Sequence, residues 1–149
     1  MRIAITGGAG FIGSNLSAAA LRAGHEVVIL DDFSTGYRDN VRDDVRLVEG
    51  SILDSSAVDE ALSGVDSVVH LAALGSVPRS IANPFASHAA NATGTLSVLE
   101  GARRAGCGHR GRHRRGQPSG SQQHRGQRRK HWRRYPGERP RRGRVRTAR

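Results

Sequence analysis

The apolar residues of the first hundred positions occur in short runs that alternate with longer stretches of helical periodicity. The runs are too short for helices and end in glycine, acidic or polar residues, which is typical of buried parallel strands. The predicted strands cover residues 2–6, 26–31, 45–49 and 65–70. The predicted helices cover residues 14–23, 54–62 and 83–104. Asp54 is a predicted N-cap, and Gly24 and Gly106 are predicted stop signals.

This alternation of strand and helix predicts an α/β fold with a Rossmann-type, doubly wound parallel sheet. The first strand, helix and second strand are completed within about thirty residues, as expected for a βαβ unit. We expect the sheet to be incomplete, because an open sheet built from residues 1–106 leaves an edge that a whole domain normally covers.

The formal net charge of +11 hides two unlike segments. Residues 1–106 hold 8 Lys and Arg against 12 Asp and Glu, whereas residues 107–149 hold 16 against the single Glu138. The second segment is dominated by Arg, Gly, His, Gln and Pro and has no helical or strand periodicity, which is typical of disordered chain. The sequence therefore predicts a Rossmann domain over residues 1–106 and a basic, disordered tail over residues 107–149.

Two origins of the basic tail stay open. It has the composition of an out-of-frame translation of a GC-rich gene, because shifting its Arg, Gly and His codons by one base gives residues that a strand accepts. As a genuine segment, its positive charge would bind nucleic acid non-specifically through phosphate contacts. The histidines of the tail are irregularly spaced, so no metal site is predicted there.

Cysteine content and the N-terminal residues bear on the compartment. Cys107 is the only cysteine, which excludes an intrachain disulfide and a cysteine-based zinc site and favours a reducing compartment. The chain begins directly with a predicted strand and has no basic segment followed by a long apolar run, as a signal peptide has. We therefore expect a soluble, cytoplasmic protein that does not enter a membrane.

A glycine-rich turn joins the first predicted strand to the first predicted helix. Its Gly8-Ala-Gly10-Phe-Ile-Gly13 spacing lets the main chain turn tightly and approach a pyrophosphate, while the helix start presents free N–H groups. Asp31 ends the second strand 18 residues after Gly13, near the spacing of an acid that binds ribose hydroxyls. A carboxylate there repels a 2′-phosphate, so the predicted cofactor is NAD in preference to NADP.

Five motifs occur in the order and spacing of a known family. They are Thr6-Gly-Gly-Ala-Gly-Phe-Ile-Gly13, Leu30-Asp-Asp-Phe-Ser-Thr-Gly36, Val48-Glu-Gly50, His70-Leu-Ala-Ala73 and Asn91-Ala-Thr-Gly-Thr95. In these motifs the chain resembles the NAD-dependent epimerase/dehydratases, extended short-chain dehydrogenase/reductases that act on nucleotide sugars. The resemblance covers residues 1–106, and residues 73–81 are most similar to the UDP-glucose and UDP-N-acetylglucosamine 4-epimerase branch.

The resemblance implies a set of binding residues. Those implied to bind NAD are Gly7, Gly10, Phe11, Ile12, Gly13, Asp31, Asp32, Ser34, Thr35, Gly36, Ser51, Ile52, Leu71, Ala72, Ala73 and Asn91. Ser76 and Ser80 are implied to face the sugar nucleotide, which is a UDP-sugar in the intact family member. The family usually has an aspartate where this chain has Ser51, so we expect altered adenine contacts at that position.

Two motif residues have structural alternatives. On a long helix, Asn91 forms a side-chain bond to the backbone about as readily as a cofactor contact. His70 ends a buried strand, and we expect it to be a packed or supporting residue instead of a catalyst.

Catalysis in the family requires a Tyr-x-x-x-Lys pair beyond the helix that ends near Gly106, where the tyrosine takes a proton from the sugar hydroxyl. This sequence has no such pair, because Tyr135 is followed four positions later by Arg139, with Pro136 between them. The resemblance thus implies the NAD-binding N-terminal part of a nucleotide-sugar 4-epimerase, possessing no catalytic residue and inactive as this chain. A dehydratase or reductase of the same superfamily, or a cofactor-binding scaffold with a nucleic-acid-binding tail, stays open, as does a homodimer.

Overall fold

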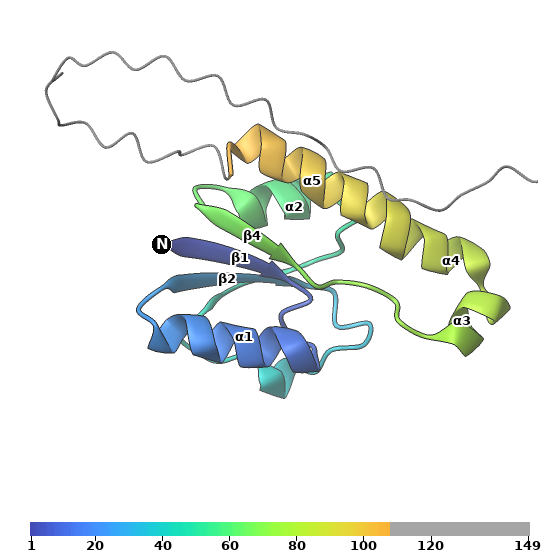
Figure 1. Ribbon diagram of the computed structural model, residues 1–149, viewed down its shortest axis with the longest axis horizontal. Coiled ribbons are helices and arrows are strands. Elements are labelled where there is room, and N and C mark those ends of the chain that lie inside the picture. Colours follow the sequence, from blue (N-terminus) through green and yellow to red (C-terminus); the bar gives the residue numbers. More distant parts are fainter. Residues whose placement is uncertain (108–149) are drawn as a thin grey trace, which may run out of the picture. The chain divides into compact units, whose positions relative to one another are not determined.

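The computed structural model describes residues 1–107, and its sheet has four parallel strands in the order β3-β2-β1-β4 (Figure 1). The strands are β1 Arg2–Thr6, β2 Glu26–Asp31, β3 Arg46–Glu49 and β4 Ser67–His70. Thr6 at the end of β1 is in register with Leu30 of β2 and His70 of β4. Because all strands are parallel, their carboxyl ends meet at one edge of the sheet, where a doubly wound fold places its binding sites.

Helices cover both faces of the sheet. The helical elements are α1 Phe11–Arg22, η1 Arg38–Asn40, α2 Ser55–Leu62, α3 Val77–Ala82, α4 Pro84–His88, the π-helical turn η2 Ala89–Thr93 and α5 Gly94–Ala105. Figure 1 shows α1 on one face of the sheet and α2 with α5 on the other. The prediction of a Rossmann-type, doubly wound parallel sheet is therefore confirmed.

The strands are apolar on both faces because each face packs against helices. Ile5 and Ile29 point to the α1 side and form a buried cluster with Ala20. Their neighbours in the chain point the other way: Ala4, Val28 and Leu30 pack with residues of α2 and α5. Alternate side chains of a strand lie on opposite faces, so a continuous apolar run is what a sheet covered on both sides requires.

The observed helix boundaries agree with the predicted ones where a capping residue marks them in the sequence. Helix α1 begins at Phe11, three residues before the predicted start, because Gly10 is its N-cap and has no side chain to mark the position. Asp54 caps α2 as predicted, and its carboxylate accepts a hydrogen bond from the Ser56 N–H. Gly106, with φ 71°, ends α5 in the left-handed conformation that favours glycine.

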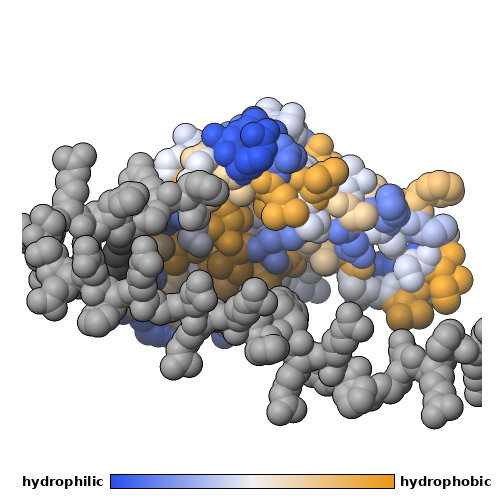
Figure 2. Space-filling view, turned by 45° about the horizontal axis from the view of Figure 1, so that its top comes forward, coloured by the Kyte–Doolittle hydropathy of each residue, from blue (hydrophilic) through white to orange (hydrophobic). Residues whose placement is uncertain are grey.

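The single helix predicted over residues 83–104 is wrong in detail. Asn83 ends α3, which was not predicted, and also caps α4, where its side chain accepts from the Ala86 N–H at 3.0 Å. The following segment widens into η2 before α5 begins at Gly94. The two short helices α3 and α4 expose Val77, Ile81 and Phe85, and Figure 2 shows apolar surface at that end of the molecule.

The predicted tail lies outside the described residues from position 108 onward, so its disorder and the domain boundary after residue 106 stay predictions. Among residues 1–107, no helix is long and apolar enough to cross a membrane.

The contact between α5 and α2 depends on Gly101. A Cβ at this position would lie 2.5 Å from Val58 Cγ1 and 3.2 Å from Leu62 Cδ1, and both side chains are fully buried. Gly101→Ala should therefore lower the free energy of unfolding by about 1–3 kcal/mol through overpacking, despite the better helix propensity of alanine. Urea denaturation measures this cost, which should largely disappear in a Val58→Ala background.

Gly75→Ala is the matched control, because nothing lies within 4 Å of the added Cβ. A loss of stability at Gly101 equal to that at Gly75, or a loss at Gly101 that Val58→Ala leaves unchanged, would contradict the close approach of the two helices.

Candidate functional site

A cavity of about 310 Å³ lies at the carboxyl ends of the strands. The turn after β1, the loops after β2 and β3, the segment after β4 and the small residues of α4 and η2 surround it. Its lining residues are Gly7, Gly10, Leu30, Asp31, Asp32, Ser34, Thr35, Gly50, Ser51, Ile52, Leu53, Leu71, Ala72, Ala73, Leu74, Ala86, Ala89 and Ala90. Its size and position are those of a small-molecule binding site in a doubly wound fold.

The glycine turn approaches its surroundings too closely for side chains. Gly7 has φ +72°, and a Cβ on it would lie 2.7 Å from the Ala72 backbone nitrogen. A Cβ on Gly13 would collide with the Gly7 carbonyl oxygen and lie 2.7 Å from the Gly8 Cα. Gly7 and Gly10 line the cavity and bear no side chains, which is the property that close approach to a pyrophosphate needs.

The N-terminus of α1 is free to receive an anion. Its N-cap is Gly10, no side chain of residues 1–107 caps the helix, and the first turn holds no acidic residue. The first N–H groups of a helix have no intrahelical partner, and the aligned peptide dipoles place about half a positive charge there. The side chains of Phe11 and Ile12 are exposed, and neither residue lines the cavity.

The Asp31 carboxylate is buried, and main-chain bonds fix its orientation. Its Oδ2 accepts from the Ala9 N–H at 2.9 Å, and its Oδ1 accepts from the Phe33 N–H at 2.9 Å. A carboxylate offers about four acceptor sites, so these two bonds leave others for a ligand. Among residues 1–107, no basic side chain forms an ion pair with Asp31.

The loop after β2 is held in an uncommon conformation. Phe33 has φ 56°, in the left-handed region that few residues other than glycine adopt. The Arg38 guanidinium lies 4.4 Å from the centroid of the Phe33 ring and also forms an ion pair with Glu49 at 2.6 Å. These contacts hold the loop over the end of the cavity that Asp32, Ser34 and Thr35 line.

The segment 71–74 forms the wall opposite this loop. Thr6 Oγ1 accepts from the N–H groups of Leu71 at 3.2 Å and Ala72 at 3.4 Å. The Asn91 side chain forms two hydrogen bonds with the main chain of Leu74. Its Nδ2 donates to the Leu74 carbonyl at 3.1 Å, and its Oδ1 accepts from the Leu74 N–H at 2.8 Å. His70, which precedes the wall, is half-buried, and this burial lowers its pKa.

The structure brings most of the predicted binding residues to one cavity. The predicted residues that line it are Gly7, Gly10, Asp31, Asp32, Ser34, Thr35, Ser51, Ile52, Leu71, Ala72 and Ala73. Gly13 and Gly36 lie behind the lining, where a Cβ on Gly36 would come 2.8 Å from the Ala9 Cβ. Ser51 reaches the cavity, and its Oγ also accepts from the Leu53 N–H at 3.2 Å.

Besides these two glycines, the predicted residues outside the lining are Phe11, Ile12, Asn91, Ser76 and Ser80. The Asn91 amide is engaged with Leu74, which corresponds to the structural alternative for this residue. Ser76 is the N-cap of α3 and accepts from the Arg79 N–H, and the Ser80 hydroxyl donates to the Val77 carbonyl. Their predicted role toward a sugar nucleotide stays a prediction.

Sequence reasoning missed the small residues of α4 and η2. Ala86, Ala89 and Ala90 line the cavity together with Leu53 and Leu74, which follow predicted motif residues directly. The available signal for these residues was a group of three alanines close together on a helix that faces a glycine-rich turn. Within residues 1–107, no group of acidic, histidine or cysteine side chains could hold a metal ion.

Comparisons with known proteins agree with this geometry. The model of the NAD dependent epimerase/dehydratase family matches residues 3–113. The UDP-glucose 4-epimerase of Corynebacterium glutamicum is 42% identical over 108 residues, which are 71% of this chain and 32% of that protein. The dTDP-glucose 4,6-dehydratase of Mycobacterium tuberculosis is 39% identical over 112 residues, which are 71% of this chain and 34% of that protein.

A solved structure supports the same comparison. The crystal structure of the Thermus thermophilus UDP-glucose 4-epimerase in complex with NAD has a TM-score of 0.67 to this chain at 37% identity. The match covers 71% of this chain and 35% of that one. The chain thus spans about a third of the length of the proteins it matches.

The lowered pKa of His70 predicts a pH dependence of stability. Between its folded pKa and the ordinary value of 6.5, the unfolded chain binds more protons at this residue than the folded chain does. The stabilisation is complete above pH 6.5 and is lost as the pH falls toward the folded pKa. Urea denaturation should therefore show a decline in the free energy of unfolding below pH 6.5 that is smaller in His70→Asn.

His88→Asn is the control, since His88 is exposed and should leave the decline unchanged. Identical pH dependence in the original chain and His70→Asn would contradict a depressed pKa at His70.

Proposed function

The chain belongs to the NAD dependent epimerase/dehydratase family, and we propose that it is the NAD-binding N-terminal part of a nucleotide-sugar 4-epimerase. The family match confirms the resemblance predicted from the five motifs. The observation that carries the proposal is the convergence of the uncapped α1 N-terminus and the buried Asp31 carboxylate on one cavity.

The residues present fit a dinucleotide. The main chain of the glycine turn and the start of α1 would hold the pyrophosphate, because Gly7 and Gly10 line the cavity and bear no side chains. Asp31 would accept hydrogen bonds from the adenosine ribose hydroxyls, with the adenine lying against Ser51 and Ile52. Leu71, Ala72 and Ala73 would form the apolar wall. NAD, when bound, supplies the hydride acceptor for oxidation of a sugar hydroxyl.

The charges around the cavity favour NAD over NADP. The Asp31 carboxylate would repel a 2′-phosphate. Arg38, a basic residue of the neighbouring loop, lies against Phe33 and forms an ion pair with Glu49. Accepting a 2′-phosphate on Arg38 would require breaking these contacts, so discrimination between the cofactors rests on two residues.

The epimerase assignment rests on similarity. The C. glutamicum and T. thermophilus relatives are UDP-glucose 4-epimerases, and the resemblance over residues 73–81 favours the same branch. We accordingly propose a UDP-sugar as the substrate of the intact protein, with Ser76 and Ser80 on its side of the site. The similarity to a dTDP-glucose 4,6-dehydratase keeps a dehydratase as the second candidate.

We further propose that this chain alone does not catalyse epimerisation. The residues that line the cavity include no tyrosine or lysine, and the 149-residue sequence has no Tyr-x-x-x-Lys pair. General acid–base catalysis contributes on the order of a hundredfold to ten-thousandfold, and positioning of the substrate contributes more. The imidazole of His70, at the end of β4, is engaged by two threonine hydroxyls.

Replacing Asp31 tests the proposed ribose contact. Asp31→Asn keeps the side-chain volume but removes the charge and one of the two acceptors of main-chain N–H bonds, so NAD binding should weaken by about 1.5–3 kcal/mol. The preference for NAD over NADP should shrink at the same time, because the 2′-phosphate is no longer repelled. Isothermal titration calorimetry measures both affinities, with Asp39→Asn as a control on the exposed η1. Equal NAD and NADP affinities in the original chain would contradict the role of Asp31.

An activity assay tests the catalytic part of the proposal. The purified chain should not interconvert UDP-glucose or UDP-N-acetylglucosamine epimers at saturating NAD, because no residue transfers the hydroxyl proton. A gene with the reading frame restored after codon 106 gives the comparison protein. Turnover by the original chain would overturn its inactivity, and dehydration of the substrate by the restored protein would favour the dehydratase.

A further inference from the structure

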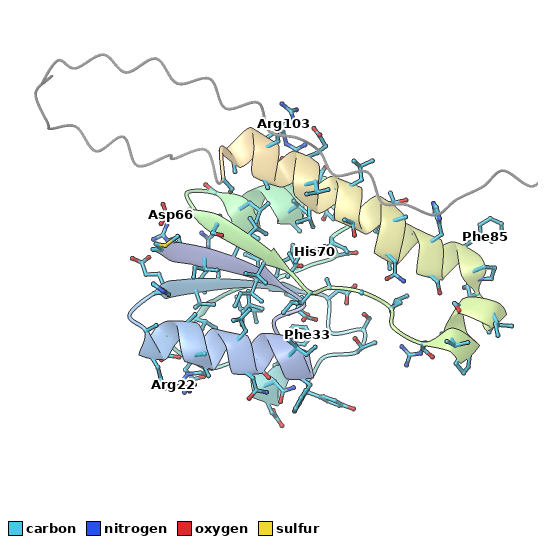
Figure 3. All side chains as sticks on the ribbon, viewed as in Figure 1. Arg22, Phe33, Asp66, His70, Phe85 and Arg103 are labelled. Atoms are coloured by element: carbon cyan, nitrogen blue, oxygen red, sulfur yellow. The ribbon has the colours of Figure 1, made fainter. Side chains whose placement is uncertain are left out.

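His70 lies at the end of β4, between the sheet and α5 (Figure 3). Its Nδ1 is 2.6 Å from Thr6 Oγ1 on β1, and its Nε2 is 3.1 Å from Thr95 Oγ1 on α5. Both ring nitrogens are thus engaged by hydroxyl groups from different elements. A histidine that only filled space would not require a hydrogen-bond partner on each of its ring nitrogens.

The hydroxyl protons determine where the imidazole proton lies. The Thr95 hydroxyl donates its single proton to the Asn91 carbonyl at 2.7 Å, so its oxygen must accept from His70 Nε2. The Nε2 atom therefore carries the proton. In the neutral ring, Nδ1 is then an acceptor and receives the Thr6 hydroxyl proton.

The other bonds of Thr6 agree with this direction. Its oxygen already accepts the N–H groups of Leu71 and Ala72, so its proton is available for the imidazole. A doubly protonated ring would place a third donor on this oxygen and leave the Thr6 proton without its acceptor. The lowered pKa of His70 acts in the same direction, because burial opposes the charged form.

Both ends of this chain of hydrogen bonds reach the cavity wall. Thr6 holds Leu71 and Ala72, and Asn91, whose carbonyl receives the Thr95 proton, holds Leu74 by two bonds. The wall in turn touches the glycine turn, since a Cβ on Gly7 would lie 2.7 Å from the Ala72 nitrogen. The position of residues 71–74 therefore constrains two sides of the cavity, namely this wall itself and the glycine turn that it touches.

We propose that His70 is a positioning residue that, as the neutral tautomer with its proton on Nε2, joins Thr6 to Thr95 and holds the cavity wall of residues 71–74 in place. The importance of this wall for a dinucleotide rests on the proposed function. The hydrogen-bond direction and the holding of the wall do not depend on it.

The first test reads the tautomer directly in the unchanged protein. Nitrogen-15 NMR of the full chain at neutral pH distinguishes a protonated ring nitrogen from an unprotonated one. His70 should show a protonated Nε2 and an unprotonated Nδ1. The opposite tautomer, or an averaged signal from a mixture of the two, would overturn the proposal.

The second test breaks the network at Thr95, outside the cavity lining. Thr95→Val removes the acceptor for Nε2–H and the donor to Asn91, whereas Thr95→Ser keeps both. Hydrogen exchange of the Ala72 and Leu74 amides should accelerate about fivefold or more in Thr95→Val and return to the original rate in Thr95→Ser. The Leu71 amide is the internal control, because its N–H also donates to the Thr6 carbonyl at 3.0 Å.

NAD affinity adds a readout in the same variants. It should fall about fivefold in Thr95→Val and recover in Thr95→Ser. Unchanged exchange at Ala72 and Leu74 would overturn the positioning role whatever the affinity. If the original chain binds no NAD, the proposed function fails, while the tautomer and the exchange rates still decide the role of His70.

Discussion

The structure depends on the close contact between the glycine turn after β1 and the wall after β4. Only a residue without a Cβ fits at Gly7, because Ala72 lies against it, and only glycine fits at Gly13, because the Gly7 carbonyl faces it. This contact brings the ends of β1 and β4 to one edge, and the Asp31 bond to the Ala9 N–H adds the end of β2. Three strand ends thus meet at the cavity, through a main-chain contact between the turn and the wall and a carboxylate bond to the main chain.

Features set by local signals were predictable from the sequence. The apolar runs predicted β1 and β2 at their observed bounds, and Asp54 predicted the start of α2, because strand burial and helix capping act within a few residues. Asp31 was predicted from its spacing to Gly13, and it lines the cavity. Helix α3 and the turn η2 were not predicted, although Ser76 and Pro78 are local signals for the start of α3. The hydrogen bonds between the Asn91 side chain and Leu74 could not be predicted from local signals, because the two residues are 17 positions apart.

Binding a dinucleotide and transferring a proton require different groups, and the described residues supply the first set more completely than the second. The described residues supply an anion-binding helix start, a buried carboxylate and an apolar wall, which together suit a dinucleotide. Proton transfer from a hydroxyl group needs a base within hydrogen-bond reach, and His70 is occupied between Thr6 and Thr95. The relatives are about three times as long as the part that matches this chain.

The most direct measurement of the central claim is an NMR titration of the full chain with NAD, following the backbone amides. The account predicts that chemical shift changes concentrate in residues 7–13, around Asp31 and in the wall of residues 71–74. The groove between β4 and α5, which Val68, Val98 and Ala102 line, should stay unchanged. An absence of shifts, or shifts confined to that groove, would contradict a dinucleotide site at the carboxyl ends of the strands.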